Sequence, residues 1–104
     1  MSDAKLIALY PHPTDIEKFN RDYEDHLKLL HKVLQLPADA HPYSVTRFAE
    51  TPLGKPVYYQ MFTFNFPSIE AMQEGLSSPA MLALAEDATR ISTGGAPIFM
   101  VGLV

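Results

Sequence analysis

The chain has 104 residues, 47% of them hydrophobic and 19% charged, which suits one folded domain and excludes a disordered chain. Lys and Arg number 8 against 12 Asp and Glu, a net charge of -4 without a basic cluster, so neither nucleic acid nor an anionic membrane is an expected partner. The absence of cysteine excludes disulfides, thiolate metal sites and cysteine nucleophiles.

The N-terminal segment MSDAKLIALYPHP differs from a signal peptide in two ways. It has no basic region before its apolar run and no small-residue cleavage site after it. No apolar run in the chain approaches the roughly 20 residues that a membrane-spanning helix needs. We therefore expect the protein to reside in the cytoplasm.

The first predicted strand is KLIALY, residues 5–10, and the prolines of PHP end it. A helix is then expected to begin at Thr14, which precedes Glu17 by the three residues of a capping box. Apolar residues follow at intervals of three and four, the pattern of a helix with one buried face: Ile16, Phe19, Tyr23, Leu27, Leu30 and Leu34. The prolines of QLPADAHP end this helix.

The rest of the chain predicts three strands and a divided helix. YSVTRFA, residues 43–49, and VYYQMFTFNF, residues 57–66, are rich in β-branched and aromatic residues and flank the turn ETPLGKP. Ser68 is expected to cap the short helix IEAMQEGL, and Ser78, followed by proline, to cap a longer one. TGG ends that helix, and PIFMVGLV, residues 97–104, predicts the last strand.

The order βαββαβ predicts an α+β chain of ferredoxin-like fold, with a four-stranded antiparallel sheet and its helices on one face. Residues 1–104 form one domain. Apolar side chains alternate onto both faces of the strands at 57–66 and 97–104, but one chain supplies only one helical layer. A second sheet from another copy is the expected cover, so a homodimer is predicted. The alternative is a monomer with an exposed apolar sheet.

A set of short motifs follows in order along the chain: a Tyr-Pro-x-Pro opening, a Phe, a Tyr and a His on one helix, a Ser-Pro helix start and a Gly-Gly before the last strand. The residues are Tyr10, Pro11, Pro13, Phe19, Tyr23, His26, Ser78, Pro79, Gly94 and Gly95. Together they resemble the EthD-like family of the dimeric α+β barrel superfamily. The family often has a proline soon after the helix histidine and a Pro-Gly-Leu before the second strand. This chain has neither, which predicts a longer first helix.

The resemblance implies a homodimer whose two sheets face each other, with a small cleft between sheet and helices in each subunit. It implies no particular reaction, because the superfamily includes monooxygenases, isomerases, cyclases and decarboxylases. An EthD-like domain of this kind is expected to bind a small molecule.

His26 is the main candidate for chemistry. It follows Tyr23 by three residues and Phe19 by seven, which places it about 50° from the centre of the apolar stripe, within reach of the cleft. Histidine is the natural general acid or base near neutral pH, and the family match at this position supports that role. Asp22, four residues earlier, could pair with it. The alternatives are a boundary histidine bonded to a strand carbonyl and an Asp22 that is merely solvated.

Tyr23 could donate its phenol hydroxyl to a substrate oxygen, or it could pack on the sheet as an ordinary core aromatic. Five residues are predicted to line the cleft, although the same spacing is typical of plain core: Tyr10, Phe19, Tyr59, Met61 and Phe62. Arg47 could meet a carboxylate or phenolate, or it could pair with Glu50 or another surface acid.

No metal site is expected. His31 follows His26 by five residues, roughly 140° around a helix, so the two cannot bind one ion from the same face. No HxxxH, HExxH or paired-carboxylate motif is present. The pair Gly94-Gly95 stands where a helix ends, whereas a phosphate-binding loop opens a helix, and there is no dinucleotide fingerprint.

The sequence therefore favours a small cofactor-independent enzyme that acts on an aromatic or polyketide-like molecule. His26 would be the general acid or base, and Tyr23 or Tyr59 would hold a substrate oxygen in a mostly apolar cleft. The alternative is a non-catalytic module, either a ligand carrier or an accessory partner of an oxidative enzyme. A catalytic His26 should open onto a cavity and have a hydrogen-bond partner, whereas a carrier could have it sealed by packing.

Overall fold

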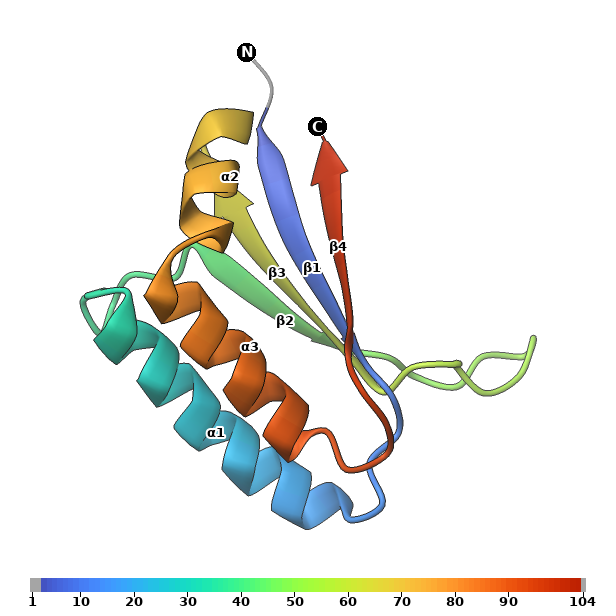
Figure 1. The fold of residues 1–104 in the computed structure, drawn as a ribbon. Coiled ribbons are helices and arrows are strands. Elements are labelled where there is room, and N and C mark those ends of the chain that lie inside the picture. Colours follow the sequence, from blue (N-terminus) through green and yellow to red (C-terminus); the bar gives the residue numbers. More distant parts are fainter. Residues whose placement is uncertain (1–2, 104) are drawn as a thin grey trace.

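The structure is a computed structural model that describes residues 3–103, and its elements follow the predicted order. They are β1 (Ala4–Tyr10), α1 (Ile16–Val33), β2 (Tyr43–Arg47), β3 (Gln60–Phe66), α2 (Ile69–Leu76), α3 (Pro79–Ile91) and β4 (Ile98–Leu103). The strands form one antiparallel sheet in the order β2-β3-β1-β4. The helices all lie on one side of it (Figure 1). The predicted ferredoxin-like α+β fold is confirmed.

Each helix begins at a side chain that accepts a backbone N–H. α1 begins after Asp15, whose carboxylate accepts the N–H three residues later at 3.1 Å. The prediction that Thr14 caps this helix is wrong, because Asp15 takes the N-cap position, and the N–H of Thr14 donates to Thr93 Oγ1 outside the helix. Ser68 caps α2 and Ser78 caps α3, as predicted.

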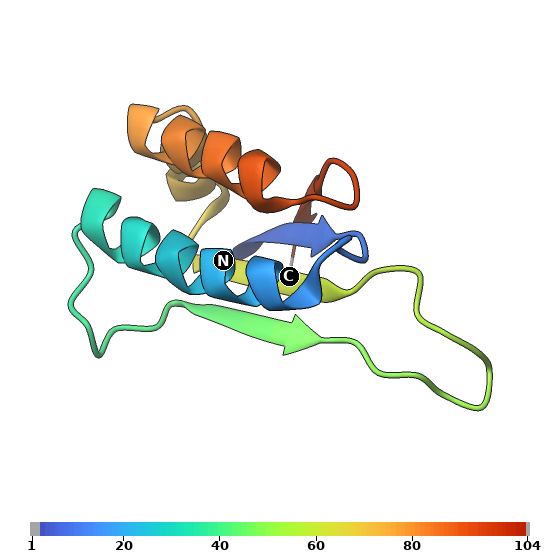
Figure 2. The same cartoon turned by 90° about the horizontal axis from the view of Figure 1, so that it is seen from below.

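The two strands around the central turn are shorter than predicted. β2 ends at Arg47, and β3 begins at Gln60 instead of Val57. The intervening residues 48–59 are named here the arm; its base stays on the sheet, where Tyr59 is buried, and its tip projects beyond the sheet (Figures 1 and 2). Its two prolines cannot donate to a strand ladder, which explains why the pairing stops. At its tip Leu53 is 100% exposed.

The sheet presents a different set of side chains on each face. Ala8 of β1 lies opposite Phe62 of β3 and Phe99 of β4, and these side chains share the helix side. The buried apolar residues that α1 and α3 add to this core are Phe19, Tyr23, Leu30, Leu84, Ala88 and Ile91. The core therefore lies between the sheet and the helices.

The opposite side, named here the helix-free face, is also apolar at its centre. The side chains that alternate onto it include Ile7, Leu9, Met61, Ile98 and Met100. Nothing in the described chain covers it, and Ile98 and Met100 are 40% and 44% exposed. The predicted last strand extends to Val104, which lies outside the described residues.

The loop after α3 packs closely against the loop after β1. A side chain at Gly94 would collide with the backbone carbonyl of His12, so only glycine allows this approach. Gly95 has φ +138°, a conformation that other residues rarely adopt. The Pro-x-Pro and Gly-Gly motifs, which lie near opposite ends of the chain, thus meet in space. Between residues 3 and 103, no helix has the length and apolar character to cross a membrane.

Candidate functional site

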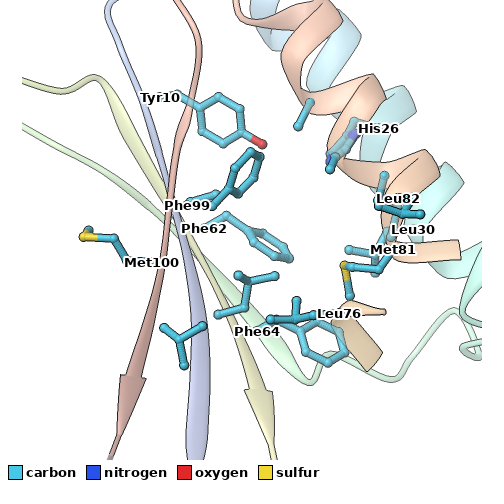
Figure 3. Close-up of a pocket in the computed structure, with 16 residues that line it drawn as sticks. Tyr10, His26, Leu30, Phe62, Phe64, Leu76, Met81, Leu82, Phe99 and Met100 are labelled. Atoms are coloured by element: carbon cyan, nitrogen blue, oxygen red, sulfur yellow. The ribbon is translucent and has the colours of Figure 1, made fainter. Parts of the chain in front are cut away.

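A cavity of about 330 Å³ lies between the helices and the β1–β4 side of the sheet (Figure 3). Small residues create the space, since Ala8 of the sheet and Ala85 and Ala88 of α3 all line it. Among its lining residues only Tyr10 and His26 have a side-chain nitrogen or oxygen. The cavity is therefore an apolar chamber with one polar end.

His26 is fixed at this polar end by α3. It is only 5% exposed, and its Nδ1 lies 2.8 Å from Oδ2 of Asp87. A carboxylate can only accept, so Nδ1 carries the proton of the neutral ring and Nε2 has a free lone pair. Nε2 has no hydrogen-bond partner among the described residues. Because His26 lines the cavity, Nε2 is the nitrogen available to a molecule inside it.

Asp87 is itself held by a second partner. Arg90, three residues later on α3, donates from Nε and Nη2 to Oδ1 at 3.0 and 2.7 Å. Burial acts to raise the pKa of Asp87, but the hydrogen bonds and charges of His26 and Arg90 outweigh burial and hold the pKa below its usual value. The carboxylate is therefore ionised at neutral pH and accepts the hydrogen bond from Nδ1 of His26.

Tyr10 supplies the other polar atom. Its side chain is almost fully buried, with the ring edge-on to Phe19 and Tyr23. In Figure 3 its hydroxyl points towards the helices, at the same end of the cavity as His26. Burial and, secondly, the charge of Asp87 raise the pKa of Tyr10, so the hydroxyl stays protonated and can donate a hydrogen bond.

The predicted lining residues fall into two groups. Tyr10, His26 and Phe62 line the cavity, whereas Phe19 and Tyr59 do not. Phe19 and Tyr59 pack edge to face, with ring centres 5.7 Å apart, in an aromatic cluster beside the cavity. They support the core and do not face the chamber.

The placement predicted for Met61 is corrected by the structure. Met61 follows Gln60 and precedes Phe62 within β3, and successive strand residues point to opposite faces of a sheet. Met61 pairs with Leu9 and lies on the helix-free face. It cannot be a wall of a cavity that lies on the helix side.

Tyr23 belongs to the aromatic cluster and does not line the cavity. Its hydroxyl is buried without a hydrogen-bond partner among the described residues, as is the amide nitrogen of Gln60. Burial is the main cause that raises the pKa of Tyr23. Tyr23 therefore carries a protonated hydroxyl that faces the protein interior.

The charged candidates have other partners. Asp22 pairs with Lys18 at 3.0 Å, while His26 pairs with Asp87 on another helix. Arg47 does not pair with Glu50. Its guanidinium donates to the side-chain oxygens of two residues, Asn20 and Gln60, and lies 4.8 Å from the ring centre of Tyr59.

His31 is turned away from His26 towards the α1–β2 connection. Its Nδ1 donates to the carbonyl of Pro37 at 3.0 Å, and its Nε2 lies 2.6 Å from the hydroxyl of Tyr43. In the described part of the chain no group of three or more His, Cys, Asp or Glu side chains is placed to hold a metal ion.

Asp87 is the site residue that the sequence reasoning missed. It stands three residues after Leu84 and four before Ile91, an acid at the edge of the buried stripe of α3. An acid at that position is a signal for a buried partner. That Asp87 pairs with His26 depends on how α1 packs against α3. The spacing of residues within one helix gives no information about that packing.

Comparison with solved structures places the chain among known folds. An ethyl tert-butyl ether D (EthD) family protein from Bacillus halodurans matches with a TM-score of 0.79 and 28% identity, over 96% of each chain. A hydroxynitrile lyase from Passiflora edulis matches with a TM-score of 0.70 and 7% identity, over 98% of this chain and 93% of that chain. A dimeric ferredoxin-like protein of unknown function from Jannaschia matches with a TM-score of 0.68 and 10% identity, over 98% of each chain.

The second and third similarities, at 7% and 10% identity, show the fold alone. No protein-family model and no curated protein matches the sequence. The similarity to the Bacillus protein extends over nearly the whole chain and agrees with the ordered motifs. The chain has a ferredoxin-like fold and is similar over nearly its whole length to an EthD family protein.

Proposed function

We propose that the protein is a small cofactor-independent enzyme that performs acid/base chemistry on an aromatic or polyketide-like molecule in this cavity. The observation that carries the proposal is the 2.8 Å contact between His26 Nδ1 and Asp87 Oδ2. This contact leaves Nε2 as a proton acceptor at the wall of an apolar chamber. A buried histidine oriented by a carboxylate is a common arrangement of a general base.

Each polar group has a role in such a reaction. His26 Nε2 removes a proton from the bound molecule, and the ionised Asp87 stabilises the imidazolium that results. The hydroxyl of Tyr10 donates to a substrate oxygen. Tyr10 takes this role in place of Tyr23 or Tyr59, because it is the tyrosine that lines the cavity. His26 then returns the proton and the site is restored.

The proposal is tested by replacing His26 with Asn and assaying turnover of phenols, aromatic ketones and lactones by mass spectrometry. Loss of a positioned proton-transfer group should lower the rate by roughly 10²–10⁴. Loss of a buried bond to a charged group should cost about 1.5–3 kcal/mol of stability, so activity is normalised to the folded fraction.

His31→Asn is the matched control, since His31 lies on the same helix, makes two hydrogen bonds and does not line the cavity. It should retain the wild-type rate once folded. Full activity of the folded His26→Asn variant would contradict the catalytic role.

The apolar character of the cavity also suits a non-catalytic ligand-binding or accessory protein, for which only His26 and Tyr10 would orient the ligand. In that case the wild-type protein binds its ligand without converting it. His26→Asn would then weaken binding modestly, and no member of the assay panel would be consumed.

We further propose that the protein acts as a homodimer whose two sheets pack through the helix-free face. The exposed apolar side chains of Ile98 and Met100 support this assembly. The dimeric ferredoxin-like protein of the same fold supports it too. Helices cover the other face of each sheet, so a face-to-face dimer leaves both cavities intact.

A further inference from the structure

The charges around the cavity bear on which ligand it can bind. Within the described chain, no Lys or Arg lines it, and the charge closest to its polar end is the carboxylate of Asp87. The guanidinium of Arg90 lies on the far side of that carboxylate, bound to Oδ1, and is 59% exposed. A molecule in the cavity is therefore close to the negative charge of Asp87, which lies behind His26, and no Lys or Arg side chain among the described residues of the cavity wall balances that charge.

An anionic ligand would find this environment unfavourable. It would lose its water on entering an apolar chamber, and removing an ion from water costs several kcal/mol unless an opposite charge compensates. The only polar atoms offered are the hydroxyl of Tyr10 and Nε2 of His26. The field of Asp87 also opposes deprotonation of Tyr10, which indicates the cost of a second negative charge at this end.

The two polar atoms form a complementary pair. Tyr10 presents a donor and His26 Nε2 presents an acceptor at the same end of the cavity (Figure 3). A carbonyl oxygen of the ligand can accept the hydrogen bond from Tyr10. A hydrogen on the adjacent carbon or oxygen then faces Nε2 of His26. The rings of Phe62, Phe64 and Phe99 line the remaining space and suit a flat apolar body.

We infer that the cavity binds an uncharged, largely apolar carbonyl compound with a removable proton next to the carbonyl group, and that it rejects carboxylates of the same shape. This inference rests on the proposed function. His26 Nε2 takes the proton, and the electrons of the broken C–H bond form the C=C bond of an enolate. The negative charge moves to the carbonyl oxygen, which accepts the Tyr10 hydrogen bond. Return of the proton to carbon regenerates the ketone, so no other reactant is consumed.

The effect of ligand charge can be measured apart from that of ligand shape by comparing two compounds with the same ring system. They are 2-acetonaphthone, a neutral methyl ketone, and 2-naphthoate, a carboxylate. Binding of each to the wild-type protein at pH 7 is measured by ligand-observed NMR titration. The ketone should bind at least tenfold more tightly. In D₂O the protein should also catalyse exchange of its methyl hydrogens for deuterium, read from the loss of the methyl proton signal.

Substitutions test which residues are responsible for the deuterium exchange and for the preference for a neutral ligand. Tyr10→Phe and His26→Asn should each lower the rate of exchange at least tenfold, and His31→Asn should not. Leu82→Lys places a cation on an exposed residue at the cavity wall, so it should narrow the difference between ketone and carboxylate.

The outcomes are distinguishable. Naphthoate that binds as tightly as the ketone overturns the inference, as does a wild-type protein that binds neither compound. Selective binding of the ketone without deuterium exchange supports the selectivity for a neutral ligand and overturns the proposed acid/base function. Selective binding with exchange that depends on His26 supports both.

Discussion

The Nδ1 of His26 and the Oδ2 of Asp87 lie 2.8 Å apart, although the two residues are 61 positions apart and belong to different helices. Arg90 holds the other carboxylate oxygen, so the imidazole is oriented by a chain of fixed contacts. Such an outer partner sets the tautomer of a histidine and stabilises its protonated form. In the proposed reaction, Asp87 is thus a positioning residue that acts through His26.

Asp87→Asn should lower turnover by about 10²-fold or more, because Asn can accept from Nδ1 but brings no negative charge to the imidazolium. Ligand affinity should change little, since Asp87 does not line the cavity. Measurement of kcat and KM separates the two effects. Glu86→Gln, an exposed neighbour on α3, is the control and should leave both values unchanged. Equal rates for the two variants would contradict the role of Asp87.

Asp87 also makes stability depend on pH. Although burial opposes the effect, its partners lower the pKa of Asp87 in the folded protein below the ordinary value of about 4. A lowered acid pKa adds stability above the ordinary value, and this contribution is lost as the pH falls through the folded pKa. The stability advantage of wild type over Asp87→Asn should therefore be present at pH 7 and shrink below about pH 4. Urea unfolding at pH 7 and pH 3 measures it, and an unchanged difference contradicts the prediction.

Tyr23→Phe should leave stability unchanged or raise it by about 1 kcal/mol, because it removes a buried hydroxyl that has no partner among the described residues. Turnover should stay near the wild-type rate, because Tyr23 does not line the cavity. Tyr10→Phe is the matched comparison and should lose at least tenfold in rate. If Tyr23→Phe proves as inactive as Tyr10→Phe, then Tyr23 takes part in catalysis.

Ile7→Lys should dissociate the proposed dimer. Ile7 lies in a central strand on the helix-free face, where an interface would bury its side chain and leave a lysine charge unpaired. Sedimentation velocity at micromolar concentration should show a dimer for the wild type and a monomer for this variant. Val45→Lys, on the helix side of edge strand β2, should stay dimeric. A monomeric wild-type protein would rule out the assembly.

Gly94→Ala should destabilise the protein by about 1–3 kcal/mol, because the added methyl group collides with the carbonyl of His12 and the two loops must separate. Gly54→Ala at the tip of the arm is a useful contrast. That glycine has φ +123° but open space around it. The variant therefore carries backbone strain without a collision, and its loss of stability should be smaller than that of Gly94→Ala. Thermal unfolding compares the two, and the reverse order would contradict the close approach.

Local patterns were sufficient to predict the fold. The apolar stripe of the first helix and the caps at Ser68 and Ser78 are properties of neighbouring residues. The structure confirms both caps and buries the stripe at Phe19, Tyr23 and Leu30, whereas Ile16, predicted to belong to it, is 52% exposed. The pairing of His26 with Asp87 could not be predicted in this way, because it depends on the packing of two helices.

The side chains near the start of β3 show a second limit of prediction from the sequence, which concerns the face of the sheet that each residue occupies. Strict alternation separates Met61 from Phe62, and the structure follows it there. Tyr59 and Gln60 both lie on the helix side, since Arg47 stacks on the first and bonds to the second. Alternation fails at Tyr59 because that residue precedes the strand.

The strand order has a consequence for a chain that is cut within the arm. Every ladder in the sheet, β2 with β3, β3 with β1 and β1 with β4, joins a strand before the arm to one after it. A break between Leu53 and Gly54 would yield two pieces, neither of which retains a strand pair. Each piece alone would have no sheet on which to pack its helices, whereas the mixture could rebuild all of the ladders. Strands from the two halves of the chain therefore alternate across the sheet. We expect a chain cut in the exposed arm to give two fragments that fold only when they are mixed.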